Sequence, residues 1–224
     1  QLISDAVGVA DKDIDFSKYD YVMIVHAGEG QETSKNKNDI WSVAYVRGIF
    51  IPTNDGVTIR KAAIVPEKEA MGISPLGVYA HEFAHLLGLP DLYDIYRKAP
   101  SIGPWSLMDS GVWNGKPRGS SPPHLEAWSK IKLGWIPQSK ILLVNSSSYM
   151  NVTLYPIESE FGGYLAIKIP LKGSVYYLIE ARKNIGFDEA LPESGVLITI
   201  VDERKTSGRG IVRAIDANST SKTL

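Results

Sequence analysis

The stretch Pro75-Leu-Gly-Val-Tyr-Ala-His81-Glu82-Phe-Ala-His85-Leu-Leu-Gly88-Leu-Pro-Asp91 holds a helix whose beginning and end are both visible in the sequence. Apolar residues occupy most positions from 76 to 87, which predicts a mostly buried helix over residues 75–87. Ser74 and Pro75 suit the first turn of a helix, and Gly88 suits its end. The two histidines and the glutamate therefore lie on a helix with fixed spacing.

His81 and His85 are four residues apart, so their side chains share one face of the predicted helix and can bind the same ion. Glu82 lies beside them, near the place of a metal-bound water. The alternative is a pair of ordinary histidines on an amphipathic helix. Because the rest of the helix is apolar, two uncommitted buried histidines would cost desolvation energy without compensation. We therefore predict zinc ligands at His81 and His85 and a general base at Glu82.

A catalytic zinc site needs a third protein ligand and an open position for water. Gly88 permits a sharp turn, and Asp91 completes the pattern H-E-x-x-H-x-x-G-x-x-D, similar to that of metzincin peptidases with aspartate in the last place. Asp91 could instead be a turn-forming residue. Glu126 and His124, both on a later predicted helix, are the alternative third ligands. The turn at Gly88 favours Asp91.

The segment from residue 90 to residue 123 is rich in Gly, Pro, Ser and Asp but also holds Trp105 and Trp113. Disordered segments are poor in aromatic residues, so we expect a structured active-site loop. Met108 follows the histidine motif within this loop and fits the methionine turn that underlies the metal in metzincins. The alternative is an ordinary core methionine.

Composition excludes several classes of protein. The chain has 224 residues, a net charge of −1 and no cysteine. A nucleic-acid-binding surface would need a basic patch, which this charge balance argues against. The lack of cysteine excludes disulfides, thiolate metal sites and cysteine nucleophiles. No apolar run is long enough to span a membrane. The chain begins at Gln1 rather than Met, which favours a piece cut from a longer precursor.

The remaining pattern predicts an α+β protein. Strands are expected over residues 19–26, 41–51 and 57–65, and a second helix over 124–133. Beyond residue 137, short apolar or alternating runs at 141–144, 149–155, 163–169, 174–180 and 195–201 predict an antiparallel β region. Residues 164–169 and 175–179 are expected to form a hairpin. We therefore predict a catalytic domain over residues 1–136, with a twisted sheet and an active-site helix, and a β-rich region over 137–224.

The sequence resembles the immune inhibitor A-type zinc metallopeptidases of bacteria and archaea. The most specific blocks are 81–94, which reads HEFAHLLGLPDLYD, and 103–113, which reads GPWSLMDSGVW; a third block covers 123–135. Residues 14–20, 25–32, 176–182 and 186–195 are also similar. His26 also lies in a block that resembles the family. From the sequence pattern alone, we interpret His26 as a histidine at the end of a strand that holds a neighbouring loop.

The resemblance implies a secreted zincin-type endopeptidase that acts on proteins or peptides, is made as a precursor and binds zinc and often calcium. Carried over by position, His81 and His85 are ligands, Glu82 the general base and Met108 the turn methionine. Ala84 and Val43 depart from the family pattern.

Two other functions remain open: a zinc hydrolase of narrow specificity, and a catalytically silent surface or binding protein. For calcium, we considered Asp91, Asp94 and Asp109. They lack EF-hand spacing, and solvated loop acids are the simpler interpretation.

Overall fold

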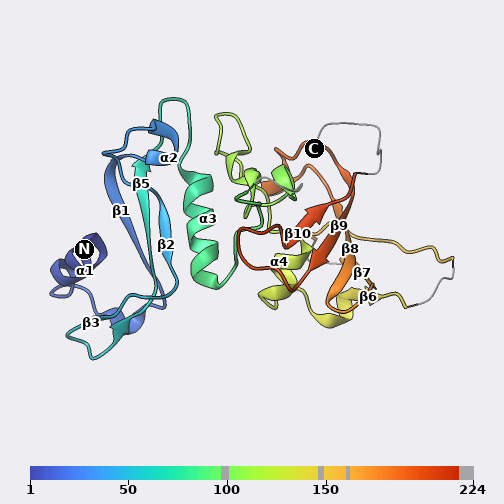
Figure 1. The fold of residues 1–224 in the computed structure, drawn as a ribbon, viewed down its shortest axis with the longest axis horizontal. Coiled ribbons are helices and arrows are strands. Elements are labelled where there is room, and N and C mark those ends of the chain that lie inside the picture. Colours follow the sequence, from blue (N-terminus) through green and yellow to red (C-terminus); the bar gives the residue numbers. More distant parts are fainter. Residues whose placement is uncertain (97–100, 146–148, 160–161, 217–224) are drawn as a thin grey trace. The chain divides into compact units, whose positions relative to one another are not determined.

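The computed structural model describes residues 1–96, 101–145, 149–159 and 162–216 of a mixed α/β chain (Figure 1). The chain forms two compact units. The first unit consists of Gln1–Gly88 with Pro117–Ser120, and the second of Leu89–Lys116 with Ser121–Leu224. In the described part of the chain, every helix is too short or too polar to cross a membrane. The predicted domain boundary at residue 136 stays a prediction.

The first unit is built on a sheet of three strands in the order β1-β5-β2. β1 (Val22–Glu29) runs parallel to the central strand β5 (Ala62–Lys68), whereas β2 (Val43–Tyr45) pairs with β5 in antiparallel orientation. β2 is thus an edge strand with an antiparallel neighbour. A small hairpin of β3 (Ile51–Pro52) and β4 (Thr58–Ile59) completes the strands.

Helices lie on both faces of this sheet (Figure 1). α1 (Leu2–Ala10) covers one face, where its Ile3 and Val7 join a buried cluster with Ile64 of β5. α3 (Leu76–Leu87) packs against β5 and β2. The short α2 (Gln31–Ser34) follows β1, and residues 16–18 form one turn of 3₁₀ helix. The sheet therefore lies between α1 and α3.

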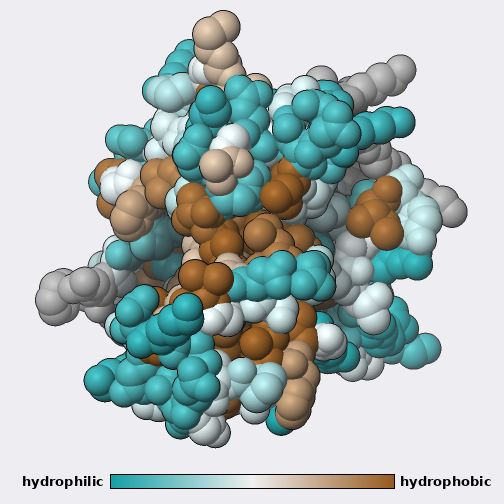
Figure 2. Space-filling model, turned by 90° about the vertical axis from the view of Figure 1, so that its left-hand side faces the viewer, coloured by the Kyte–Doolittle hydropathy of each residue, from teal (hydrophilic) through white to brown (hydrophobic). Residues whose placement is uncertain are grey.

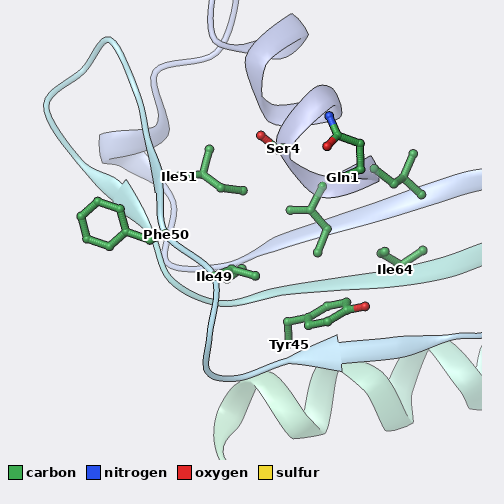
Figure 3. A pocket seen from close by; sticks show the side chains of 9 residues that line it. Gln1, Ser4, Tyr45, Ile49, Phe50, Ile51 and Ile64 are labelled. Atoms are coloured by element: carbon green, nitrogen blue, oxygen red, sulfur yellow. The ribbon is translucent and has the colours of Figure 1, made fainter.

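An apolar pocket of about 330 Å³ lies where the first turn of α1 meets the sheet (Figure 3). Side chains from α1, β2, β3, β5 and the residues just before β3 surround it, among them Leu2, Tyr45, Phe50, Ile51 and Ile64. Hydrophobic side chains also gather in the middle of the face seen from this side (Figure 2). On this face, apolar side chains therefore form a patch.

In this unit, the helix predicted over 75–87 and the first strand, predicted over 19–26, are confirmed as α3 and β1. The predictions of the other two strands, over 41–51 and 57–65, are wrong in part. The predicted strand over 41–51 is interrupted after Tyr45, where Gly48 takes a φ of +83° that breaks regular strand geometry. The predicted strand over 57–65 divides into β4 and β5.

The second unit contains a sheet of five strands in the order β10-β9-β8-β7-β6. The strands are β6 (Ile141–Leu143), β7 (Ala166–Pro170), β8 (Val175–Arg182), β9 (Gly195–Asp202) and β10 (Val212–Ala214). The predicted hairpin is confirmed as β7 and β8. The expectation of purely antiparallel pairing is wrong at one place, because β6 runs parallel to β7. The run at 149–155 contributes only an isolated bridge between Leu154 and Tyr164.

α4 (Ala127–Lys132) packs on β8 and is shorter than the helix predicted over 124–133. It begins later because Glu126, in an extended conformation, caps it by accepting a hydrogen bond from the Ser129 amide. The segment before it forms 3₁₀ turns at residues 103–105 and 110–113, and further turns occur at 138–140 and 186–188. The predicted structured loop is confirmed for these parts; residues 97–100 lie outside the described residues.

Candidate metal centre

α3 presents His81 and His85 on one face, as their spacing requires. Their Nε2 atoms lie 3.1 Å apart, and their rings meet edge to face with 4.6 Å between centroids. Glu82 is buried, with 7% of its surface exposed. The helix ends at Gly88, whose φ of +107° allows its amide to close the last turn on Ala84 and His85. The chain can therefore turn away sharply behind the second histidine.

Asp91 joins the two histidines in a possible metal-binding group. One donor atom from each of His81, His85 and Asp91 lies within 4.8 Å of the others. In a tetrahedral zinc site, metal–ligand distances of about 2.1 Å place the ligand atoms about 3.4 Å apart. The two histidine nitrogens, 3.1 Å apart, are close to that value, and two imidazoles with one carboxylate are a donor set that zinc accepts. These residues thus fit a zinc ion.

The two alternative third ligands have other roles in the second unit. Glu126 is 1% exposed and accepts hydrogen bonds from Ser106 Oγ at 2.7 Å and from the amide and hydroxyl of Ser129. His124 packs its ring against Phe187, and burial, followed by the charge of Lys130, lowers its pKa. Neither residue belongs to the group formed by His81, His85 and Asp91.

Met108 lies in the core of the second unit and is fully buried. Its carbonyl accepts a hydrogen bond from the Leu92 amide at 2.9 Å, so the segment around Met108 is attached to the chain next to Asp91. Its own amide donates to Ser106 Oγ at 3.0 Å. Gly111 closes the turn where no side chain fits, because a Cβ there would lie 2.3 Å from the Ser106 carbonyl oxygen. A place for Met108 beneath a metal stays a prediction.

The acidic residues considered for calcium are also engaged within the second unit. Asp109 accepts hydrogen bonds from the amides of Gly103 at 2.8 Å and Ser110 at 2.7 Å. Asp94 accepts one from the Tyr96 amide at 2.9 Å. Neither belongs to the metal-binding group found among the described residues. A calcium site stays a prediction.

A buried arginine that the sequence analysis missed organises the loops of the second unit. Arg182 is 2% exposed and uses all five of its N–H groups. It binds Asp188 through Nε and Nη2 at 2.9 and 2.8 Å, and Glu180 through Nη1 at 3.1 Å. Its remaining N–H groups donate to the carbonyls of Trp105 at 3.0 Å and His124 at 3.1 Å. One side chain thus ties β8 to the turn at residues 103–105 and to the residues just before α4.

Burial and the neighbouring charges of this cluster shift the pKa values of its carboxyl groups. Burial raises the pKa of Glu180 to about 7, although Arg182 acts in the opposite direction. Burial would also raise the pKa of Asp188, but hydrogen bonds with Glu158 and Arg182 outweigh it and leave the pKa lowered. Periodicity could not reveal this cluster, because Glu180 and Arg182 share the buried face of β8 with Tyr176 and Leu178 while the opposite row of the strand is apolar.

A second buried carboxyl lies in the first unit behind the glycine-rich turn after β1. Burial raises the pKa of Glu69 to about 7; the nearby charge of Glu32 acts in the same direction, and a hydrogen bond from Thr33 acts against it. A Cβ at Gly30 would lie 2.9 Å from oxygens of both carboxyl groups, so a side chain there would displace the carboxyl end of Glu32 or Glu69. His26 of β1 is buried, and its Nδ1 lies 2.9 Å from the neighbouring Ala27 carbonyl oxygen.

The family model of the immune inhibitor A peptidase M6 catalytic domain matches residues 9–136, more than half of the chain and including all of α3. The chain belongs to this peptidase family. The match confirms the resemblance drawn from the motifs at 81–94 and 103–113. The matched family model describes the catalytic domain of a peptidase.

Curated relatives agree with the family. The chain is 35% identical over 127 residues to Immune inhibitor A of Bacillus thuringiensis subsp. alesti, and 33% identical over 123 residues to the pre-pro-metalloprotease PrtV of Vibrio cholerae. Each match covers 50% of this chain. A putative secreted metallopeptidase of Arthroderma benhamiae is 26% identical over 187 residues. The matches span 18% of Immune inhibitor A, 13% of PrtV and 27% of the fungal protein.

Proposed function

We propose that this chain is the zincin-type catalytic part of a zinc-dependent endopeptidase that hydrolyses protein substrates. The observation that carries the proposal is the approach of donor atoms from His81, His85 and Asp91 to within 4.8 Å of one another. These three side chains would hold the ion. When bound, zinc would lower the pKa of a water ligand to about 7 and polarise the peptide carbonyl.

Glu82 would act as the proton-transfer group. It follows His81 directly on α3 and is buried, so its carboxylate is shielded from bulk water. Glu82 would accept a proton from the attacking water and later donate it to the amine that leaves.

The edge strand β2 offers a place for an extended substrate. It pairs with β5 on one side only, in antiparallel orientation, and α3 packs against both strands. A peptide could add to the outer edge of β2 by main-chain hydrogen bonds, which would give affinity with little dependence on sequence. Such binding suits an endopeptidase of broad specificity. A panel of quenched peptides distinguishes it from a hydrolase of narrow specificity, which would cleave only one or a few members.

The roles proposed for the site are tested by Glu82→Gln. We expect hydrolysis of a casein substrate to be lost while zinc content stays near one ion per chain. Glu67→Gln serves as the matched control, because Glu67 is an exposed glutamate on β5 of the same unit. Hydrolysis by the Glu82→Gln protein at the rate of the control would refute Glu82 as the base, and a zinc-free active protein would refute the zinc mechanism.

We also propose that the protein acts outside the cell as part of a larger precursor. The support comes from the relatives, of which one is described as a secreted metallopeptidase and another as a pre-pro-metalloprotease. Detection of the activity in culture medium, with the chain shorter than its gene product, would test this proposal.

A further inference from the structure

The residue proposed as third zinc ligand is held by a loop from the far end of the chain. The loop joins β9 to β10, and its members Ser207 and Gly208 contact Asp91, which lies 116 residues before Ser207. The Gly208 amide donates to the Asp91 carbonyl at 3.1 Å. The Asp91 amide donates to Ser207 Oγ at 3.0 Å. Both main-chain polar groups of Asp91 are thus bound by this loop.

The Ser207 hydroxyl also reaches the Asp91 carboxylate. Its Oγ lies 3.1 Å from Asp91 Oδ2 and donates to it. A hydroxyl has one donor and two acceptor positions, so it can accept from the amide and donate to the carboxylate at the same time. The pair of bonds fixes the carboxylate relative to its own main chain.

The position of Ser207 is itself fixed by its neighbours. The carbonyl of Gly208 accepts a hydrogen bond from the Ile95 amide at 3.1 Å, and Asp94 pairs with Arg209 in an antiparallel bridge. Gly208 has a φ of +69°, and a Cβ there would lie 2.9 Å from Ile95 Cγ2. The loop is therefore docked along residues 91–95 in a conformation that requires glycine.

We propose that Ser207 is a positioning residue that orients the Asp91 carboxylate for zinc. The proposal rests on the zinc peptidase function proposed above. Carboxylate ligands of metal sites are commonly hydrogen-bonded by a second residue that sets their orientation, and loss of that partner weakens metal binding by about 10- to 100-fold. In this chain the partner would come from the β-rich region, so that region would contribute to the metal site rather than only follow it.

The zinc dissociation constant measures this role without reference to activity. We expect Ser207→Ala to raise it by about tenfold, the lower end of the usual range, because Ser207 is exposed and water can partly replace its hydroxyl. Competition with chelators of graded affinity at fixed pH gives the constant. Ser207→Thr keeps the hydroxyl and should remain within about threefold of the parent protein. Thr206→Ala removes the adjacent exposed hydroxyl of the same loop and should change nothing.

A double-mutant cycle shows whether Ser207 acts through Asp91. In an Asp91→Ala background, Ser207→Ala should cause no further loss of zinc affinity. An unchanged dissociation constant in the single Ser207→Ala variant would overturn the proposal, and so would an equal loss in both backgrounds. Either result would leave the peptidase function intact if the parent protein still binds zinc and hydrolyses peptides. Failure of the parent protein to bind zinc would overturn both proposals.

Discussion

Glu69→Gln is expected to make the stability of the first unit less dependent on pH. Glu69 is 3% exposed, and its pKa is about 7 in the folded chain against 4.5 for an unperturbed glutamate. The folded state therefore favours the protonated form. The stabilising contribution of protonated Glu69 is fully present below pH 4.5 and is lost as the pH rises through 7. The difference in pKa corresponds to about 3 kcal/mol between these limits.

Glutamine reproduces the protonated carboxyl at every pH. Its amide can donate toward Glu32, and its oxygen can accept the hydrogen bond from Thr33 that Glu69 accepts. The variant should match the parent protein near pH 4 and exceed it by about 3 kcal/mol near pH 8. Hydrogen exchange of the β5 amides, followed by mass spectrometry at both pH values, reports the opening of this unit directly.

The comparison of the two proteins at each pH isolates Glu69 from other titrating groups. Glu67→Gln, two residues before Glu69 and on β5, is the control, and it should follow the pH dependence of the parent protein because Glu67 is exposed. Equal pH dependence in Glu69→Gln and the parent would refute the reasoning. So would a variant that is less stable than the parent at pH 8.

Three further outcomes are expected. Arg182→Met should destabilise the second unit by about 3–5 kcal/mol in urea unfolding, because Glu180 and Asp188 would lose their buried cation; a loss below about 1 kcal/mol would contradict this role. Gly111→Ala should cost at least about 2 kcal/mol by the same assay, because its Cβ would overlap the Ser106 carbonyl, and a neutral effect would show that the turn can relax. Treatment with a chelator should abolish peptide hydrolysis, and added zinc should restore it; activity that survives complete metal removal would argue against a metallopeptidase.

The sequence predicted the elements whose signals are local. The helix that carries the histidines was bounded correctly because Gly88 supplies the left-handed turn that ends it. The nine-residue helix at Leu2–Ala10 was not predicted. A helix this short is marginal in isolation, and its stability comes from packing Ile3 and Val7 on the sheet. That packing involves β5, about 60 residues away, which no local pattern records.

Which face of a strand is buried was harder to predict than the strand itself. In β8 the apolar residues Val175, Tyr177 and Ile179 alternate with a row that contains Glu180 and Arg182. Periodicity alone would turn the apolar row inward, yet the row with the charged residues is the buried one. It is stable there because the charges pair with each other and with loop carbonyls. The contact of Ser207 with Asp91 was likewise hidden by their separation in sequence.

Anomalous diffraction at the zinc edge, from crystals of the chain prepared with one equivalent of zinc, tests the central claim most directly. The account predicts a single zinc ion bound by Nε2 of His81, Nε2 of His85 and one carboxylate oxygen of Asp91, at about 2.0–2.2 Å. Zinc at a different set of residues, or no zinc at this helix, would contradict it.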